Sequence, residues 1–320
     1  MPMAEPQMVS TAVSSPSESP VRSLTELAVW RAAMWRELRP EQWIKNLFVA
    51  APVFFSQRLL EPEAVLATLA AFGLFCAMSS SVYLFNDLQD CAQDRLHPRK
   101  RLRSYAAGHL SARSLWITMV GLWLAGMIGA LALGPLFATM LLGYWLLNVV
   151  YSWRLKQWVI VDVFAVAAGY LIRIIAGAAS IHGGVSTWLL ICTTVLALFI
   201  TLCKRRHEHV LLEDGAPDHR QVLTDYPISF LDAMIGIMTA FALMSYTLYT
   251  VSEEIVGKFG SPGLLLTAPF VLYGFFRYLY LVYHKDEGGD PTQSILTDRP
   301  MMVNLLLWAA IAGVILYGKH

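Results

Sequence analysis

Charged side chains are scarce in this chain: Asp, Glu, Lys and Arg make up 15% of its 320 residues, whereas 56% are hydrophobic. Soluble domains carry about 25% charged residues, so the composition excludes an ordinary soluble protein and indicates one polytopic membrane domain. The four cysteines form no CxxC pair, which argues against a zinc site or a disulfide framework. There is also no Ser-His-Asp or Cys-His pattern typical of nucleophilic catalysis.

The N-terminal segment lacks the apolar core that a signal peptide requires. Residues 1–25 are rich in Ser, Pro and Thr, which predicts a disordered tail. A short amphipathic helix is expected from Leu24 to Leu38, with Trp30 and Trp35 near a membrane interface. We therefore place the membrane domain at 26–320.

Nine apolar runs follow this tail. In lipid, every backbone polar group must be hydrogen-bonded internally, so the runs predict an all-α bundle of about nine transmembrane helices. Gly134 and Pro135 join two of the runs and predict a tight helical hairpin. The runs cover residues 40–57, 64–86, 114–133, 136–153, 159–181, 186–204, 229–251, 263–283 and 299–317.

The stretch NDLQDCAQD, residues 86–94, ends the second apolar run. Its asparagine and its three aspartates are Asn86, Asp87, Asp90 and Asp94, and on a helix they fall within an arc of roughly 100°. Carboxylates this close to one another repel, and a hard divalent cation relieves the repulsion. Mg²⁺ prefers such oxygen ligands and leaves room for substrate phosphates, so the stretch predicts a Mg²⁺ site.

Lys and Arg residues alternate from loop to loop. Most lie before the first run or in every second loop, and the opposite side holds only Arg58, Lys258 and Lys319. The positive-inside rule then places the N-terminus and the acidic stretch in the cytoplasm and the C-terminus outside. We expect a multi-pass protein of the inner (plasma) membrane.

Basic side chains near the cytoplasmic ends have a simple explanation in anionic lipid head groups, but that explanation does not account for the acids between them. Within a span, Arg173 lies about three turns from Asp162 on nearly the same helix face. It is either a structural Arg bonded to carbonyls and a carboxylate, or part of a substrate cavity. Arg277 is expected to anchor its helix near a membrane edge.

These features together resemble the UbiA superfamily of intramembrane prenyltransferases, and more narrowly its decaprenyl-phosphate phosphoribosyltransferase branch. The acidic NDxxDxxxD motif after the second span is one of the signatures. The resemblance runs over RPEQWIKN (39–46), NDLQDCAQDRLHPRKR (86–101), AAGHLS (106–111), YSWRLK (151–156), DVFAVAAGYLIRIIAGA (162–178), KRRHE (204–208) and DRP (298–300).

One position departs from the superfamily pattern. Members that prenylate aromatic rings are expected to carry a second acidic motif after the sixth span, where this chain has Lys204, Arg205 and Arg206. Cations there suit a donor and an acceptor that carry extra phosphates. Asp214 and Asp218 could still supply a residual second acidic site.

The resemblance implies Mg²⁺-dependent transfer of 5-phosphoribose from phosphoribosyl diphosphate to a polyprenyl phosphate such as decaprenyl phosphate, for lipid-linked arabinose donors and cell-wall glycans. It implies no nucleic-acid partner, and it leaves self-association open. The implied catalytic residues are Asp90, Asp94, Lys156 and Asp162, with Asp162 and Tyr151 orienting the donor or the cations. The implied phosphate-binding residues are Lys45, Lys100, Arg101, Arg103, Tyr151, Arg173, Lys204, Arg205 and Arg206.

Two other functions remain open from the sequence. A UbiA-type enzyme that moves a polyprenyl group from its diphosphate to an aromatic acceptor would share the acidic motif, but the KRR segment argues against it. A transporter for an anionic metabolite would suit charges inside the spans, yet the sequence has no clear inverted repeat or paired broken helices.

Overall fold

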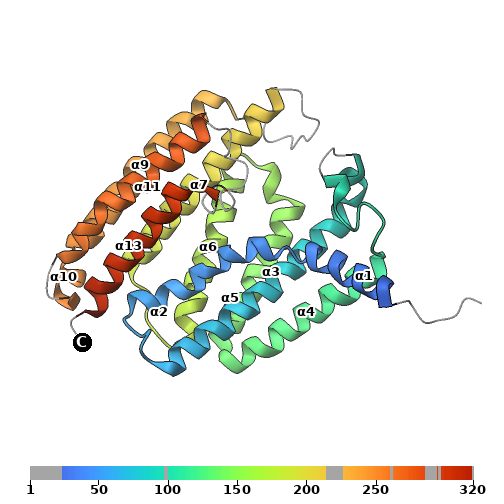
Figure 1. The fold of residues 1–320 in the computed structure, drawn as a ribbon, viewed down its shortest axis with the longest axis horizontal. Helices are drawn as coiled ribbons and strands as arrows, with labels where there is room; N and C mark the ends of the chain where they lie inside the picture. Colours follow the sequence, from blue (N-terminus) through green and yellow to red (C-terminus); the bar gives the residue numbers. More distant parts are fainter. Residues whose placement is uncertain are drawn as a thin grey trace, which may run out of the picture.

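The computed structural model describes residues 24–96, 100–213, 226–259, 262–284, 294 and 297–318. All regular elements in these ranges are helical, which confirms the expected all-α bundle (Figure 1). The elements are α1 (Leu24–Glu37), η1 (Pro40–Ala50), α2 (Ala51–Phe55), α3 (Pro62–Leu96), η2 (Lys100–Leu102), α4 (Ala112–Leu133), α5 (Pro135–Trp153), η3 (Leu155–Gln157), α6 (Val161–Ser180), α7 (Thr187–Glu213), α9 (Ile228–Val251), α10 (Glu253–Phe259), η4 (Gly263–Thr267), α11 (Ala268–His284) and α13 (Arg299–Tyr317).

Eight helical segments of the described chain are long and apolar enough to cross a membrane. They correspond to the second through ninth runs expected from the sequence, and the hairpin at Gly134 is present between α4 and α5. Residues 1–23 of the expected tail lie outside the described ranges.

The expected first span needs correction, because residues 40–57 do not form a regular transmembrane α-helix. They fold as the 3-10 helix η1 followed by the short helix α2. The 11 residues of η1 and the 5 residues of α2 still cover about 30 Å, because a 3-10 helix rises about 2.0 Å per residue. That length matches the hydrocarbon core of a bilayer.

The contacts of this segment also run from one end of the bundle to the other. At one end Trp43 donates a hydrogen bond to Ser80 of α3, and at the other Arg58 donates to the carbonyl of Ile181 beyond α6. The segment therefore crosses the bundle as a ninth, irregular element beside α3 and α6.

Gly177 lets η1 approach α6 closely. A Cβ atom at this position would overlap the backbone oxygen of Val49, because it would lie closer than two non-bonded atoms can approach. Gly177→Ala should therefore push η1 away and lower the thermal unfolding temperature by several degrees, from a cost of about 1–3 kcal/mol. Unfolding measured in detergent checks this, with Gly73→Ala as the control because no atom lies within 4 Å of a Cβ there. Equal unfolding temperatures for the two variants would contradict the tight contact.

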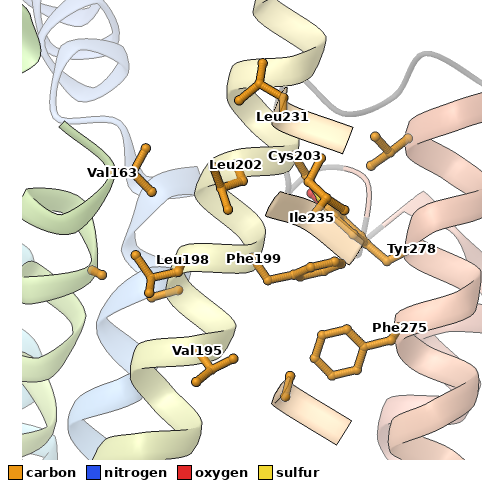
Figure 2. Close-up of a cluster of buried hydrophobic side chains, with 14 of the residues drawn as sticks. Val163, Val195, Leu198, Phe199, Leu202, Cys203, Leu231, Ile235, Phe275 and Tyr278 are labelled. Atoms are coloured by element: carbon orange, nitrogen blue, oxygen red, sulfur yellow. The ribbon is translucent and has the colours of Figure 1, made fainter. Parts of the chain in front are cut away.

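The bundle core forms on both sides of α6. On one side Phe199 of α7 packs edge-to-face on Phe275 of α11, with ring centroids 4.8 Å apart (Figure 2). On the other side Phe75 of α3 packs on Phe137 of α5 at 5.9 Å. Helix α6 contributes buried residues to both clusters and has the most buried candidate span, at 67%. Helix α6 is therefore the central helix, and it packs against both hydrophobic clusters.

Two helices extend well past the length that a bilayer requires. Helix α3 has 35 residues and α7 has 27, or about 52 and 40 Å. Their last turns carry the acidic stretch and the KRR segment, respectively. The α3 end contacts Lys156 of η3, and the α7 end contacts Tyr151 in the last turn of α5, which η3 follows after Arg154, so the two ends lie at the same end of the bundle. We call this the polar end: the last turns of α3 and α7 with η2 and η3.

Candidate active site

The acidic stretch lies on the last turns of α3, and its carboxylates differ in exposure. Asp87 and Asp94 are buried, at 2% and 4% exposure, whereas the Asp90 side chain is 38% exposed. Two oxygens, Asn86 Oδ1 and Asp87 Oδ2, are buried with no hydrogen-bond partner among the described residues. Buried oxygens of this kind cost free energy unless a donor or a cation meets them.

Two arginines neutralise the buried pair of carboxylates. Arg103 NH1 lies 2.6 Å from Asp94 Oδ2 and 3.2 Å from Asp87 Oδ1, so it bridges them. Arg39 also donates to Asp87 Oδ1, and its guanidinium lies 4.9 Å from the ring centroid of Tyr83. The sequence analysis did not assign Arg39 to the site. Its place at the start of the RPEQWIKN segment, directly before Pro40, was the available signal.

Part of the acidic stretch is suited to hold a Mg²⁺ ion, although not all four of the expected ligands are available. No group of three or more His, Cys, Asp or Glu side chains in the described chain is arranged to hold a metal, because Arg103 separates two of the acids. Mg²⁺ needs only one or two carboxylates beside waters and substrate phosphates. The unpartnered oxygens of Asn86 and Asp87, with the exposed Asp90 one turn further on, meet that requirement.

The segment that joins α5 to α6 brings Lys156 to the acidic stretch. Lys156 lies on η3, and its Nζ is 3.9 Å from Asp90 Oδ1. Both side chains remain partly exposed. An accessible carboxylate beside an accessible ammonium can hold a metal-bound diphosphate from two sides.

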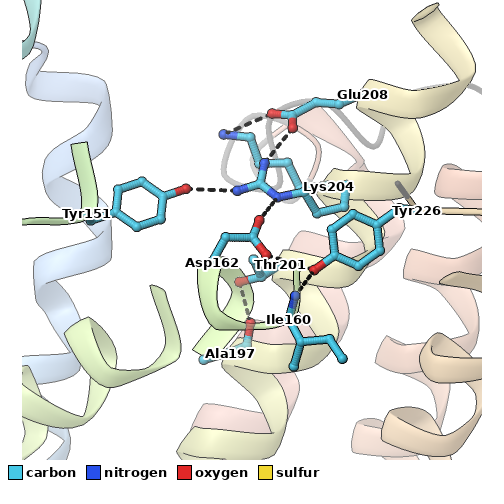
Figure 3. A network of polar contacts seen from close by, with 9 residues as sticks. Tyr151, Ile160, Asp162, Ala197, Thr201, Lys204, Glu208 and Tyr226 are labelled. Carbon is cyan, nitrogen blue, oxygen red and sulfur yellow. Dashed lines mark hydrogen bonds and ion pairs between the residues drawn. The ribbon is translucent and has the colours of Figure 1, made fainter. Parts of the chain in front are cut away.

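Arg205 is the centre of a second, buried network. Its partners Tyr151, Asp162 and Glu208 are labelled in Figure 3. Its Nε donates to Asp162 Oδ2 at 2.6 Å, its NH2 donates to Tyr151 at 2.9 Å, and its NH1 donates to Glu208. Asp162 and Tyr151 thus both contact the Arg205 guanidinium, and their expected role in orienting the donor or the cations stays a prediction. Because its described partners already use every nitrogen of the guanidinium, Arg205 fixes helices α5, α6 and α7 relative to one another.

Tyr226 completes this network from the start of α9. Its hydroxyl donates to Asp162 Oδ1 at 2.8 Å and accepts from the backbone N–H of Ile160. Burial raises the pKa of the Tyr226 phenol, and its hydrogen bond to Asp162 adds to the rise. The phenol therefore stays protonated and keeps its role as a donor at neutral pH. The sequence analysis did not identify this residue.

The three cations of the KRR segment point in different directions. Lys204 is partly exposed and lies 3.9 Å from Glu208. Arg206 lies on another face of α7, where its Nε donates to Asp232 of α9 at 2.6 Å and its guanidinium stacks 4.0 Å from the ring centroid of Tyr283. The structure therefore groups Lys204 and Arg205 with Asp162 and Tyr151, and it holds Arg206 against α9 and α11.

Arg173 lies deeper in the bundle, about 16 Å along α6 from Asp162. Its Nε donates to Asn46 of η1, NH1 to the carbonyl of Gly169 and NH2 to Tyr144 of α5, each at 2.9 Å. These contacts match the structural alternative, with an amide in place of the expected carboxylate. Its role in phosphate binding stays a prediction.

Of the remaining predicted residues, Lys100 and Arg101 lie at the polar end. Lys45 Nζ donates to Gln42 at 2.5 Å on η1. Lys100 and Arg101 lie on η2, and Arg101 is exposed. Asp214 and Asp218, the candidates for a second acidic site, lie outside the described residues.

Helix α1 holds the loop that carries Arg103. The buried carboxylate of Glu37, at the end of α1, accepts the backbone N–H of Tyr105 at 2.7 Å. From α3, Arg95 Nε donates to the carbonyl of Ala106 at 3.3 Å. These contacts tie the loop to α1 and to α3, and Arg103 of the same loop reaches the two buried carboxylates.

Comparison with known proteins decides the family. The chain matches the UbiA prenyltransferase family over residues 46–301. It belongs to that family. As a UbiA-family protein it is a multi-pass integral membrane transferase, which confirms the resemblance found in its motifs.

Two UbiA-family relatives differ in their names. The decaprenyl-phosphate phosphoribosyltransferase of Mycobacterium tuberculosis is 31% identical over 288 residues, covering 88% of this chain and 93% of that protein. The nodulation protein NoeC of Azorhizobium caulinodans is 29% identical, covering 84% of this chain and 88% of that protein.

A solved structure shares the fold. The UbiA homologue from Archaeoglobus fulgidus bound to DMAPP and Mg²⁺ has a TM-score of 0.64 at 17% identity, covering 88% of this chain and 98% of that one.

Proposed function

We propose that this UbiA-family transferase moves 5-phosphoribose from phosphoribosyl diphosphate to a polyprenyl phosphate and releases diphosphate. The observation that carries the proposal is the pairing, at one end of the bundle, of an acidic helix end with a cationic one. Lys204 and Arg205 stand where a prenyl-diphosphate enzyme is expected to carry a second acidic motif. The similarity to decaprenyl-phosphate phosphoribosyltransferases over most of the chain supports the same donor.

The reaction needs little more than alignment and charge neutralisation. A phosphate oxygen of the acceptor attacks C1 of the ribose, and the C1–O bond to diphosphate breaks with its electron pair leaving on the diphosphate. The acceptor phosphate is already ionised at neutral pH, so no general base is required. Bound Mg²⁺ would stabilise the charge that develops on the leaving diphosphate. Alignment of the two reactants can contribute several kcal/mol to lowering the barrier.

The exposure of each side chain suggests its role. Asn86, Asp87 and Asp90 would hold the ion, and Asp94 would keep Arg103 in place. Lys156 would contact the donor diphosphate, because its ammonium is accessible beside Asp90. Lys204 is accessible for a further phosphate, whereas Asp162 and Arg205 are buried and act by fixing the helices.

We further propose that the polar end faces the cytoplasm, where a soluble phosphorylated sugar is available. The described cations Arg103, Lys156, Lys204 and Arg205 lie at this end, and the positive-inside rule then orients the bundle. The lipid acceptor enters sideways from the bilayer, with its phosphate at the level of the polar end. Decaprenyl phosphate is the acceptor that the named relatives suggest.

The direct test supplies purified protein with phosphoribosyl diphosphate labelled in the ribose, polyprenyl phosphate and Mg²⁺. The expected result is a labelled lipid and a stoichiometric amount of diphosphate, both lost when EDTA removes the metal. No labelled lipid, with transfer of a prenyl group from polyprenyl diphosphate to an aromatic acid instead, would favour the other UbiA chemistry. The labelled lipid also distinguishes a transferase from a transporter, because only the former makes a covalent product.

A further inference from the structure

Two consecutive arginines of α7 form matching arrangements on different faces of the helix. Arg205 donates to Asp162, which also accepts from Tyr226. Arg206 donates to Asp232, which also accepts from Tyr283 at 2.7 Å. Each arrangement contains one arginine, one aspartate and one tyrosine hydroxyl. The two therefore allow a matched comparison within one protein.

The Arg205 arrangement differs in burial and in one additional bond. Asp162 and Tyr226 are fully buried, whereas Asp232 and Tyr283 are more than a third exposed. The Tyr226 hydroxyl also accepts the backbone N–H of Ile160 (Figure 3). Tyr226 thus ties the start of α9 to the backbone that leads into α6.

That backbone has an unusual conformation. Ile160 has φ 69° and ψ −46°, and the N–H of Val161 bonds to the carbonyl of Val159 at 2.8 Å. This is a γ-turn with positive φ, a strained conformation that is rare for any residue and rarer for a β-branched one. Strained turns persist only where surrounding contacts hold them. The described contact that holds the Ile160 N–H is the Tyr226 hydroxyl.

The position of the turn connects it to the donor site. Lys156 lies on η3, four residues before Ile160, and its ammonium faces Asp90. Around the turn, the backbone N–H of Trp158 donates a hydrogen bond to the carbonyl of Leu155, and the N–H of Asp162 donates to the carbonyl of Trp158. A change in the turn would therefore be transmitted through a short, hydrogen-bonded segment to the lysine.

We propose that Tyr226 is a positioning residue that holds the Ile160 turn and thereby keeps Lys156 beside Asp90. The inference rests on the proposed function, in which Lys156 contacts the donor diphosphate. Tyr226 itself does not touch the reactants. It acts through the backbone, from a position two residues before α9, and so makes donor binding depend on how the start of α9 packs against the Ile160 turn.

The test compares Tyr226→Phe with Tyr283→Phe in full-length protein in detergent. Each variant removes one hydroxyl from a carboxylate that keeps its arginine partner. Hydrogen–deuterium exchange of the peptide over residues 154–163 is measured first, because it does not depend on activity. We expect the amide of Ile160 to exchange about tenfold faster in Tyr226→Phe, which corresponds to about 1.4 kcal/mol, and to be unchanged in Tyr283→Phe.

Steady-state kinetics provide the second measurement. In Tyr226→Phe the KM for phosphoribosyl diphosphate should rise about tenfold, while the KM for polyprenyl phosphate stays within about twofold of the wild-type value. A variant that is merely less stable would contain fewer active molecules and show a lower apparent kcat, but its KM values for the two substrates would not change by different factors. Tyr283→Phe should leave both KM values unchanged.

The outcomes separate the inference from the proposed function. Unchanged exchange in Tyr226→Phe, or equal effects of the two variants on exchange and KM, would overturn the role of Tyr226. Faster exchange in Tyr226→Phe, combined with a wild-type protein that makes no phosphoribosyl lipid, would support the hold on the turn and overturn the proposed function.

Discussion

Replacing Asp90 by alanine should lower the rate of the proposed phosphoribosyl transfer by about 10²–10³-fold without unfolding the protein, as expected when one preorganised electrostatic contact to a developing charge is lost. Asp90 is the accessible carboxylate of the acidic stretch, and its described ion pair is a 3.9 Å contact with Lys156. An exposed pair of this kind contributes about 0–1 kcal/mol to stability. The loss should therefore appear in turnover and not in folding.

The measurement is the initial rate with saturating labelled donor, together with the thermal unfolding temperature. Gln89→Ala is the matched control, because Gln89 is exposed on the same turn of α3 and carries no carboxylate. If Asp90→Ala turned over substrate at nearly the same rate as Gln89→Ala, the assignment of Asp90 to the site would be wrong. Asp87 is a less informative target, since its loss would leave Arg39 and Arg103 without a shared partner.

Sequence alone predicted the parts of the molecule that the bilayer dictates. Runs of about 20 apolar residues must become helices in lipid, so eight spans followed directly from the sequence. The placement of the acidic stretch on a helix end also followed, since Asn86 to Asp94 continue the run that ends at residue 86. Motif spacing then identified the family.

Tertiary contacts decided what sequence could not. The first crossing is the 3-10 helix η1, whose backbone at Val49 packs closely against Gly177 of α6, and hydropathy does not report this contact. Arg39 reaches Asp87 from 48 positions away in the chain. Consecutive residues also face different neighbours. Arg205 and Arg206 differ by about 100° around α7, so Arg205 contacts Asp162 in the site network and Arg206 contacts Asp232 of α9.

Replacing Arg205 by alanine should have the largest effect on stability. The change would leave Asp162, which is fully buried, with Tyr226 as its remaining described side-chain partner. Removing one partner of a buried ion pair costs about 3–5 kcal/mol, because the other charge stays without compensation in a low dielectric. For a protein of this size that corresponds to a fall of about 10 °C in the unfolding temperature. Thermal unfolding in detergent measures it.

Arg206→Ala provides the matched control one residue away. Its partner Asp232 is 37% exposed, so water can solvate the carboxylate when the guanidinium is gone. The expected cost is about 1 kcal/mol or less, with a shift of only a few degrees. Equal shifts for the two variants would contradict the distinction between a buried network that fixes α5, α6 and α7 and a peripheral contact to α9. Asp162→Asn in the Arg205→Ala background should recover part of the lost stability, because a neutral amide needs no counter-charge.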